Sequence, residues 1–182
     1  MLQTKGTNGV QVYLSIALLS VVVPLALTAV AQQPPDVWTQ AEQKIVRLPA
    51  ERFPNAPEKV RKLIEEQGCL VPQPGDRVRA GEAPVNVASG AFAVKGQLDW
   101  AVLCSRKGRS SIIVLWGGAA RCESPFAEDP DKLYLQSRGG DLIDYSREIG
   151  AASPAVIRST YRILGETPPK VSHDAIDDFF VV

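Results

Sequence analysis

The sequence predicts an α+β fold in which helices pack on a mostly antiparallel sheet of about five strands, following an N-terminal signal peptide. Residues 85–149 contain apolar stretches of strand length that are separated by turn residues. Segments with the apolar spacing of helices lie before this region, in residues 36–68, and after it, in residues 153–165. Helices that flank a run of strands are typical of α+β domains.

The N-terminal segment has the features of a secretory signal. Lys5 is the only charged residue before Asp36, and a long apolar run ends in Ala29-Val30-Ala31, the small-x-small pattern that signal peptidase recognises. We therefore expect residues 1–31 to be a signal peptide and the mature chain to begin at Gln32.

An uncleaved membrane anchor is the alternative for this segment, because the apolar run approaches the ~20 residues that span a bilayer. Pro24 within the run and the Ala-x-Ala site favour cleavage. In both cases residues 32–182 are expected to form a single exported α+β domain, periplasmic or extracellular. We expect no membrane contact after cleavage.

Two helices are expected within residues 36–68. Asp36 can cap the first helix, whose apolar side chains recur at helical spacing until Pro49. The second begins at Pro57 and ends at Gly68, with one apolar stripe: Val60, Leu63 and Ile64.

Pro72–Pro84 is expected to be a loop, and three strands follow it. Their ranges are 85–92, 98–105 and 111–116. The last two strands are joined by Arg106-Lys107-Gly108-Arg109, a hairpin turn that places glycine at a left-handed position. Both of these strands are apolar on both faces, which indicates a sheet that is covered on both sides.

The remaining elements follow in order along the chain. A second hairpin is expected from residues 133–137 and 142–149. A helix over residues 153–165 is expected to turn Val156, Ile157, Tyr161 and Leu164 inward. Residues 166–182 form a tail whose last apolar residues, from Phe179 onward, pack or start a strand.

Three cysteines lie in the mature part of the chain. Cys69 follows a helix end and Cys104 ends a buried strand, whereas Cys122 lies in the Gly117–Pro130 loop. In an oxidising compartment we expect a disulfide between Cys69 and Cys104, with Cys122 free. No pair of cysteines has the spacing of a zinc site.

Charge and motifs exclude several classes of function. Twenty basic residues balance twenty acidic ones, so we expect neither a nucleic-acid nor an anionic-membrane partner. The chain contains no Walker loop, GxGxxG, GxSxG or HExxH motif. We therefore expect no cofactor and no metal.

The candidate polar site consists of Asp99, His173, Asp174 and Asp177. His173 is the only histidine, and neighbouring carboxylates suit acid–base chemistry or a hard cation. A solvated turn or helix start is the alternative for 173–178, and we favour it because an EF-hand glycine and glutamate pattern is missing. For Asp99 we favour hydrogen bonds to the preceding loop over a ligand contact.

Several motifs resemble a group of small exported bacterial proteins of uncharacterised function. The similar stretches cover most of the mature chain: Phe53-Pro54, Gly68–Gln73, Asn86–Phe92, Gly96–Ser105, Tyr145-Ser146-Arg147 and His173–Asp178. The most specific of them is Gly-Gln-x-Asp-Trp-Ala-Val-Leu-Cys. The resemblance implies export but no activity.

The chain departs from this group at two points. Similar sequences have glycine in place of Ala175, and they continue past the acidic turn into a further strand. We therefore expect an uncovered sheet edge that favours association. Residues 87–102 are also similar, more weakly, to an FG-GAP blade, but that motif's calcium-binding aspartates are missing apart from Asp99.

From these observations we expect an exported, non-catalytic protein of the cell envelope or periplasm that binds an unknown ligand or partner. The alternative is a hydrolase that uses His173 with nearby aspartates. The position of His173 relative to Asp99 and Asp177, and to any concave surface, discriminates between the two.

Overall fold

The computed structural model describes residues 36–118, 122–123 and 126–181. These residues belong to one compact unit, Pro34–Val182. The expected signal peptide, residues 1–31, and its cleavage site after Ala31 lie outside the described residues. Within the described ranges, no helix has the length and apolar character that a membrane span requires.

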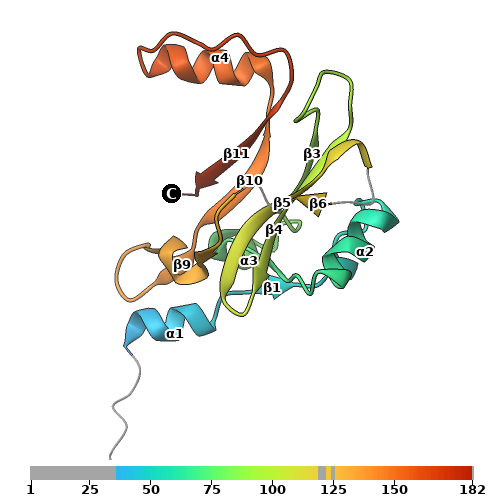
Figure 1. The fold of residues 1–182 in the computed structure, drawn as a ribbon. Coiled ribbons are helices and arrows are strands. Elements are labelled where there is room, and N and C mark those ends of the chain that lie inside the picture. The colour runs from blue at the N-terminus through green and yellow to red at the C-terminus, as the bar shows by residue number, and fades with distance from the viewer. Residues whose placement is uncertain (1–35, 119–121, 124–125, 182) are drawn as a thin grey trace, which may run out of the picture. The chain divides into compact units, whose positions relative to one another are not determined.

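The α+β class is confirmed (Figure 1). The described helices are α1 (Val37–Gln43), η1 (Ala50–Arg52), α2 (Glu58–Glu66), α3 (Gly75–Ala80), η2 (Trp116–Gly118), η3 (Asp131–Tyr134) and α4 (Pro154–Ile163). The described strands are β1 (Arg47–Leu48), β2 (Val71–Pro72), β3 (Val87–Gly90), β4 (Asp99–Arg106), β5 (Arg109–Leu115), β6 (Cys122–Glu123), β7 (Asp129–Pro130), β8 (Leu135–Ser137), β9 (Ile143–Tyr145), β10 (Arg147–Ala152) and β11 (Ala175–Phe180). All of their pairings are antiparallel.

The largest sheet has the order β3-β4-β5-β6, and β7 also pairs with β5. Its centre is the expected hairpin, in which Arg106 lies opposite Arg109 across a two-residue turn. Lys107 and Gly108 both have positive φ, at 52° and 75°. Two successive left-handed residues match the twist of antiparallel strands, which confirms the predicted role of this glycine.

The hairpin strands are buried on both faces, as their composition predicts. Val102 and Ile113 belong to one apolar cluster, whereas Leu103 and Ile112 belong to another. Cross-strand partners such as Val102 and Ile113 share a face of the sheet. β4 and β5 therefore lie between two separate cores.

The first face is covered by α2 and η1. Val60 and Ile64 are almost fully buried in this cluster, and the opposite side of α2 is charged. The second face is covered by α1, the β8–β9 hairpin and β10, which contribute Ala41, Tyr145 and Ile149.

Strands β8 to β11 do not join the main sheet. β8 and β9 form the expected hairpin, but it is a separate two-stranded sheet. β10 pairs with β11 over six residues, from Arg147 opposite Phe180 to Ala152 opposite Ala175. The C-terminal segment expected as a tail therefore contains a strand. Its aspartates disfavour a strand locally, and its pairing with β10 decides its conformation.

Two further expectations about local structure are wrong. The expected loop at residues 72–84 contains α3, which two ion pairs hold on β9 and β10: Arg79 with Asp144 and Arg77 with Glu148. The first helix ends at Gln43 because Arg47 and Leu48 pair with β2 in extended form.

The orientation expected for the last helix is also wrong. α4 has a serine N-cap and the predicted length, but it has no buried residue. Val156 and Leu164, expected inward, are 50% and 65% exposed. Only one flank of α4, with Ile157 and Tyr161, is half-buried.

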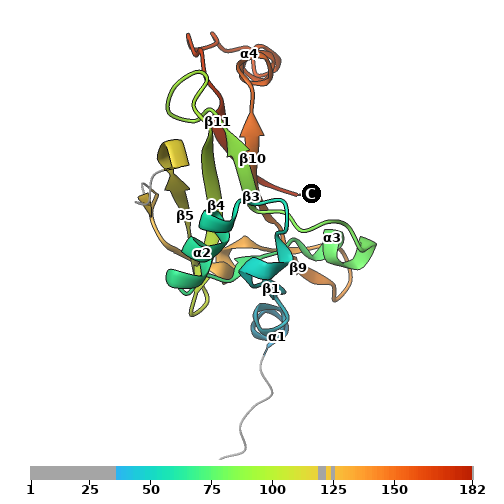
Figure 2. The same cartoon turned by 90° about the vertical axis from the view of Figure 1, so that its right-hand side faces the viewer.

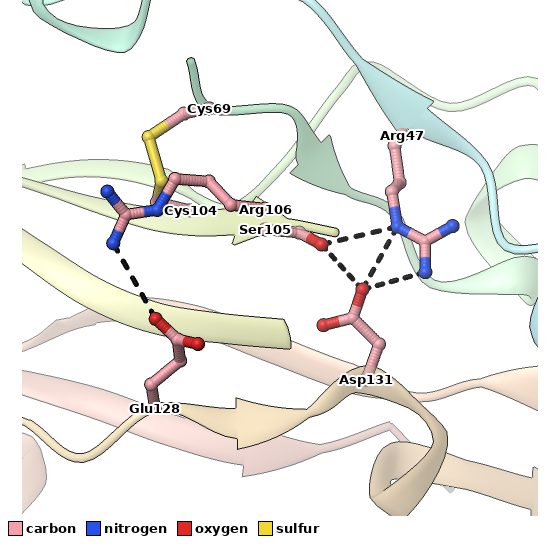
Figure 3. The surroundings of a disulfide bond; sticks show 7 residues. All are labelled: Arg47, Cys69, Cys104, Ser105, Arg106, Glu128 and Asp131. Carbon is pink, nitrogen blue, oxygen red and sulfur yellow. Dashed lines mark hydrogen bonds and ion pairs between the residues drawn. A yellow bond between two sulfur atoms is a disulfide. The ribbon is translucent and has the colours of Figure 1, made fainter. Parts of the chain in front are cut away.

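The predicted disulfide joins Cys69 and Cys104, whose Cα atoms lie 5.0 Å apart (Figure 3). It links the residues after α2 to β4, and both cysteines are buried. The side chain of Cys122 lies outside what the structure describes, so its free state stays a prediction.

Candidate functional site

Asp99 is fully buried at the start of β4 and binds the loop before this strand and η2, which follows β5. Its Oδ2 accepts a hydrogen bond from the backbone N of Ala93, at 2.9 Å. Its Oδ1 accepts bonds from the backbone N of Gly117 and from Nε2 of Gln97, both at 2.6 Å. The expected contact with the preceding loop is therefore present.

These bonds decide the charge of Asp99. Burial raises the pKa of its carboxyl, but the hydrogen bonds from Gly117, Gln97 and the 92–93 backbone lower it more, so the net pKa lies below the usual value. An ionised carboxylate that is enclosed by donors is suited to fixing loops. It is poorly suited to proton transfer near neutral pH.

His173 is half-buried just before β11. Its Nδ1 lies 2.9 Å from the backbone O of Asp174. Asp174 in turn bonds to Ala91, through its carboxylate at 2.9 Å and through its backbone N at 3.0 Å. Asp174 therefore fixes the chain before β11 to the residues after β3.

The four predicted site residues are brought together only in part. Asp99, in β4, and Asp174, just before β11, both bind the short segment 91–93. Asp177 is exposed on β11, opposite Gly150. In the described part of the chain, neither Asp99 nor Asp177 bonds to the ring of His173.

Gln73 and Asn86 are two buried amides whose importance sequence reasoning missed. Gln73 exchanges hydrogen bonds with the backbone of Val85, at 2.8 and 3.0 Å. Asn86 has a φ of 73°, donates to the backbone O of Pro72 and accepts from the backbone N of Ile149, at 2.8 Å. Asparagine tolerates the left-handed region better than most residues. The identity of residue 86 as asparagine was therefore the one sign in the sequence of its backbone conformation.

Arg147 and Asp178 form a second overlooked pair, between β10 and β11. Two guanidinium nitrogens donate to the two carboxylate oxygens, both at 2.8 Å. The side chain of Arg147 is only 4% exposed, and its guanidinium carbon lies 4.3 Å from the ring centroid of Tyr134. This pair therefore fixes the register of β11.

Asp131 is a second fully buried carboxylate, which sequence reasoning also missed (Figure 3). It accepts hydrogen bonds from Arg47 at 2.7 and 3.0 Å, and from the hydroxyls of Ser105 and Ser110, both at 2.6 Å. Four donors satisfy its two oxygens, so the role that this geometry supports is structural.

A cavity of about 480 Å³ lies between α1, α3 and the β8–β9 hairpin. Its lining is mainly apolar, and Val37, Val78 and Leu142 are between 42% and 50% exposed. The sequence offered no signal for it, because its walls come from three segments that are distant along the chain. Asp99 and His173 line neither this cavity nor the hollows beside α2, η1 and α4.

The charged groups around this cavity balance one another. Lys44 and Arg79 are matched by Asp141 and Asp144, and Arg79 is paired with Asp144. Of the potential ligands among the described residues, no three His, Cys, Asp or Glu side chains are grouped so that they could hold a metal ion.

Comparison with known proteins adds nothing to this geometry: no family model, no curated protein and no solved structure matches the chain.

Proposed function

We propose that this chain is an exported, non-catalytic binding domain whose ligand occupies the cavity between α1, α3 and the β8–β9 hairpin. The observation that carries the proposal is that half-exposed apolar side chains from all three segments face one hollow: Val37, Val78 and Leu142. Mainly apolar concave sites with a few polar groups are typical of small-molecule binding.

The ligand that suits this cavity is small, largely apolar and without net charge. A charged ligand would need an unmatched counter-charge in the lining. The carboxylate of Asp144 is already bound to Arg79, and Lys44 balances Asp141.

A binding role is favoured over the hydrolase alternative by how the polar side chains are used. The carboxylates of Asp99 and Asp174 are engaged by backbone N–H groups. An acid–base pair with His173 needs a carboxylate that can reach its ring. The contacts described for His173 supply none, so we put binding forward.

Export is supported by the apolar N-terminal run and by its Ala29-Val30-Ala31 end. The disulfide between Cys69 and Cys104 is compatible with export. We expect N-terminal sequencing of the protein recovered outside the cytoplasm to show that the mature chain begins at Gln32. A full-length chain held in the membrane would favour the anchored alternative.

The cavity is tested by titration with N-phenyl-1-naphthylamine, an uncharged apolar fluorophore. We expect saturable binding to a single site, and a loss of roughly tenfold or more in affinity for Val78→Asp, because a carboxylate then enters the apolar lining. Val94→Asp is the matched control, since Val94 is 55% exposed and lies outside the cavity.

Two outcomes would contradict the cavity proposal. One is non-saturable binding, and the other is equal affinity in the two variants. Circular dichroism of both variants establishes that neither change unfolds the domain.

A further inference from the structure

Helix α4 presents apolar side chains to solvent instead of packing them inward. Ile163 is 84% exposed, Leu164 is 65% exposed and Val156 is 50% exposed. Exposed apolar groups that lie together on a small domain mark a surface that contacts something else.

The same helix carries a local excess of positive charge. Residues 154–172 contain three cations, Arg158, Arg162 and Lys170, and one carboxylate, Glu166, so the segment has a net charge of 3 − 1 = +2. The three cationic side chains line one hollow with Pro168 and Pro169. None of the three is hydrogen-bonded or ion-paired to another described residue.

The position of each residue around the helix shows how these two properties are arranged. At ~100° per residue, Val156 and Ile163 lie about 20° apart and Arg158 and Arg162 lie about 40° apart, and the two pairs are separated by roughly 130° around the helix. The half-buried flank with Ile157 is the one turned toward β10. A flat surface that approaches α4 from its free side therefore meets the apolar pair first, and the arginines reach it from the flank of the helix through their long side chains.

A second segment reaches the same end of this unit. In Figures 1 and 2, the loop between β3 and β4 extends to the level of α4, beyond the end of β10. This loop region contains Val94, 55% exposed, Leu98, 59% exposed, and the exposed cation Lys95. The combination of apolar and cationic side chains is thus repeated beside the helix.

We infer that α4 and the β3–β4 loop form a docking surface for an anionic lipid bilayer. The balanced charge of the whole chain led us to expect no such partner, but the structure segregates cations at this end. Apolar side chains enter the interfacial region of the bilayer, and unpaired cations meet its anionic headgroups. Docking is independent of the cavity proposed above.

The test is co-flotation of the full exported chain with vesicles of phosphatidylcholine alone and of phosphatidylcholine mixed with phosphatidylglycerol. We expect binding to be much stronger with phosphatidylglycerol and to weaken as salt is added. R158Q/R162Q is expected to weaken it roughly 30-fold, and I163S roughly tenfold. The matched controls are R52Q/K132Q and L133S, which remove exposed groups elsewhere and are expected to bind like the original chain.

Any apolar N-terminal residues that the chain retains contribute equally to vesicle binding in every variant. The difference in binding between the α4 variants and their controls therefore tests the docking surface. The inference is overturned if the two vesicle types bind equally, or if the α4 variants match their controls. Calorimetry with soluble glycerol phosphate separates a bilayer from a free anion. Saturable binding of glycerol phosphate that R158Q/R162Q abolishes would show an anion pocket instead of a docking surface.

Discussion

Asp131 is a buried carboxylate whose hydrogen-bond donors all come from the protein. Arg47, Ser105 and Ser110 surround it, and solvent does not reach it. Removing the carboxylate leaves a largely buried guanidinium and two buried hydroxyls without their acceptor. We therefore expect Asp131→Ala to lower the free energy of unfolding by roughly 3–5 kcal/mol, measured by urea denaturation.

Glu128→Ala is the control for this substitution. Glu128 forms ion pairs with Arg106 and Arg109, but all three side chains are 40% exposed or more. Such surface pairs contribute less than about 1 kcal/mol. Equal losses for the two variants would show that Asp131 is not a buried structural anchor.

Asn86 combines a strained backbone with two side-chain functions. It is buried at a φ of 73° and bonds to the backbone of Pro72 and Ile149. Asn86→Gly and Asn86→Ala lose the same hydrogen bonds, but only alanine adds the steric cost of the left-handed conformation. We expect both variants to be destabilised, and alanine to be the less stable by about 1 kcal/mol in thermal or urea unfolding. Equal stability of the two would contradict the backbone argument.

At the scale of elements, the disulfide attaches the end of α2 to the central sheet. Its cysteines are 35 residues apart in sequence. Cross-linking a loop of this length stabilises the fold by ~3–4 kcal/mol in the chain-entropy model. The double variant Cys69→Ala/Cys104→Ala is expected to lose about this amount in urea unfolding, whereas Cys122→Ala is expected to lose little. Mass mapping that links Cys122 to either partner would contradict the assigned pair.

Strand β11 depends on one ion pair for its position. The guanidinium of Arg147 is buried between Asp178 and the ring of Tyr134. Asp178→Asn leaves this cation without its counter-charge, so we expect a loss of roughly 2–3 kcal/mol in urea unfolding. We also expect faster hydrogen exchange in Ala175–Phe180. The neighbouring Asp177 is exposed, so Asp177→Asn is expected to change neither the stability nor the hydrogen exchange of β11. Similar exchange in the two variants would show that the ion pair does not hold β11 in place.

For the whole molecule, buried ionisable groups set the acid limit of stability. The pKa of Asp99 is lower in the folded chain than its usual value, so the unfolded chain binds the proton first as the pH falls. The stabilisation is present above about pH 4 and is lost as the pH falls further. We expect Asp99→Asn to be less stable at neutral pH and to show a shallower acid decline in urea unfolding. Asp177→Asn is expected to keep the original acid profile.

Tyr134 sets the alkaline limit of stability, because its pKa is raised in the folded chain whereas that of Asp99 is lowered. Burial raises the pKa of Tyr134 to about 12, an effect that the nearby Arg147 opposes without cancelling. The unfolded chain loses this proton near pH 10, so stability is complete below about pH 10 and declines as the pH approaches 12. Tyr134→Phe is expected to flatten this decline, and an unchanged alkaline profile would contradict it.

The sequence by itself determined the elements whose signals are local. The β4–β5 hairpin follows from apolar runs around Lys107-Gly108, and α2 follows from its apolar stripe between Pro57 and Gly68. Cys69 and Cys104 were predictable as a pair because Cys69 follows α2 and Cys104 lies in β4, two well-marked elements. The hairpin and α2 themselves depend on neighbours a few residues away, which backbone propensity and periodicity capture.

Only the tertiary structure decided the features that join distant segments. Arg47 and Asp131 are 84 residues apart, and the extended form of β11 depends on its pairing with β10. The periodicity of α4 predicted a helix but not whether its apolar side would be covered, because the same pattern suits a core and a docking surface. The cavity, the burial of Asp131 and the exposure of α4 therefore depend on which surfaces contact one another in the fold. Local sequence patterns do not specify those contacts.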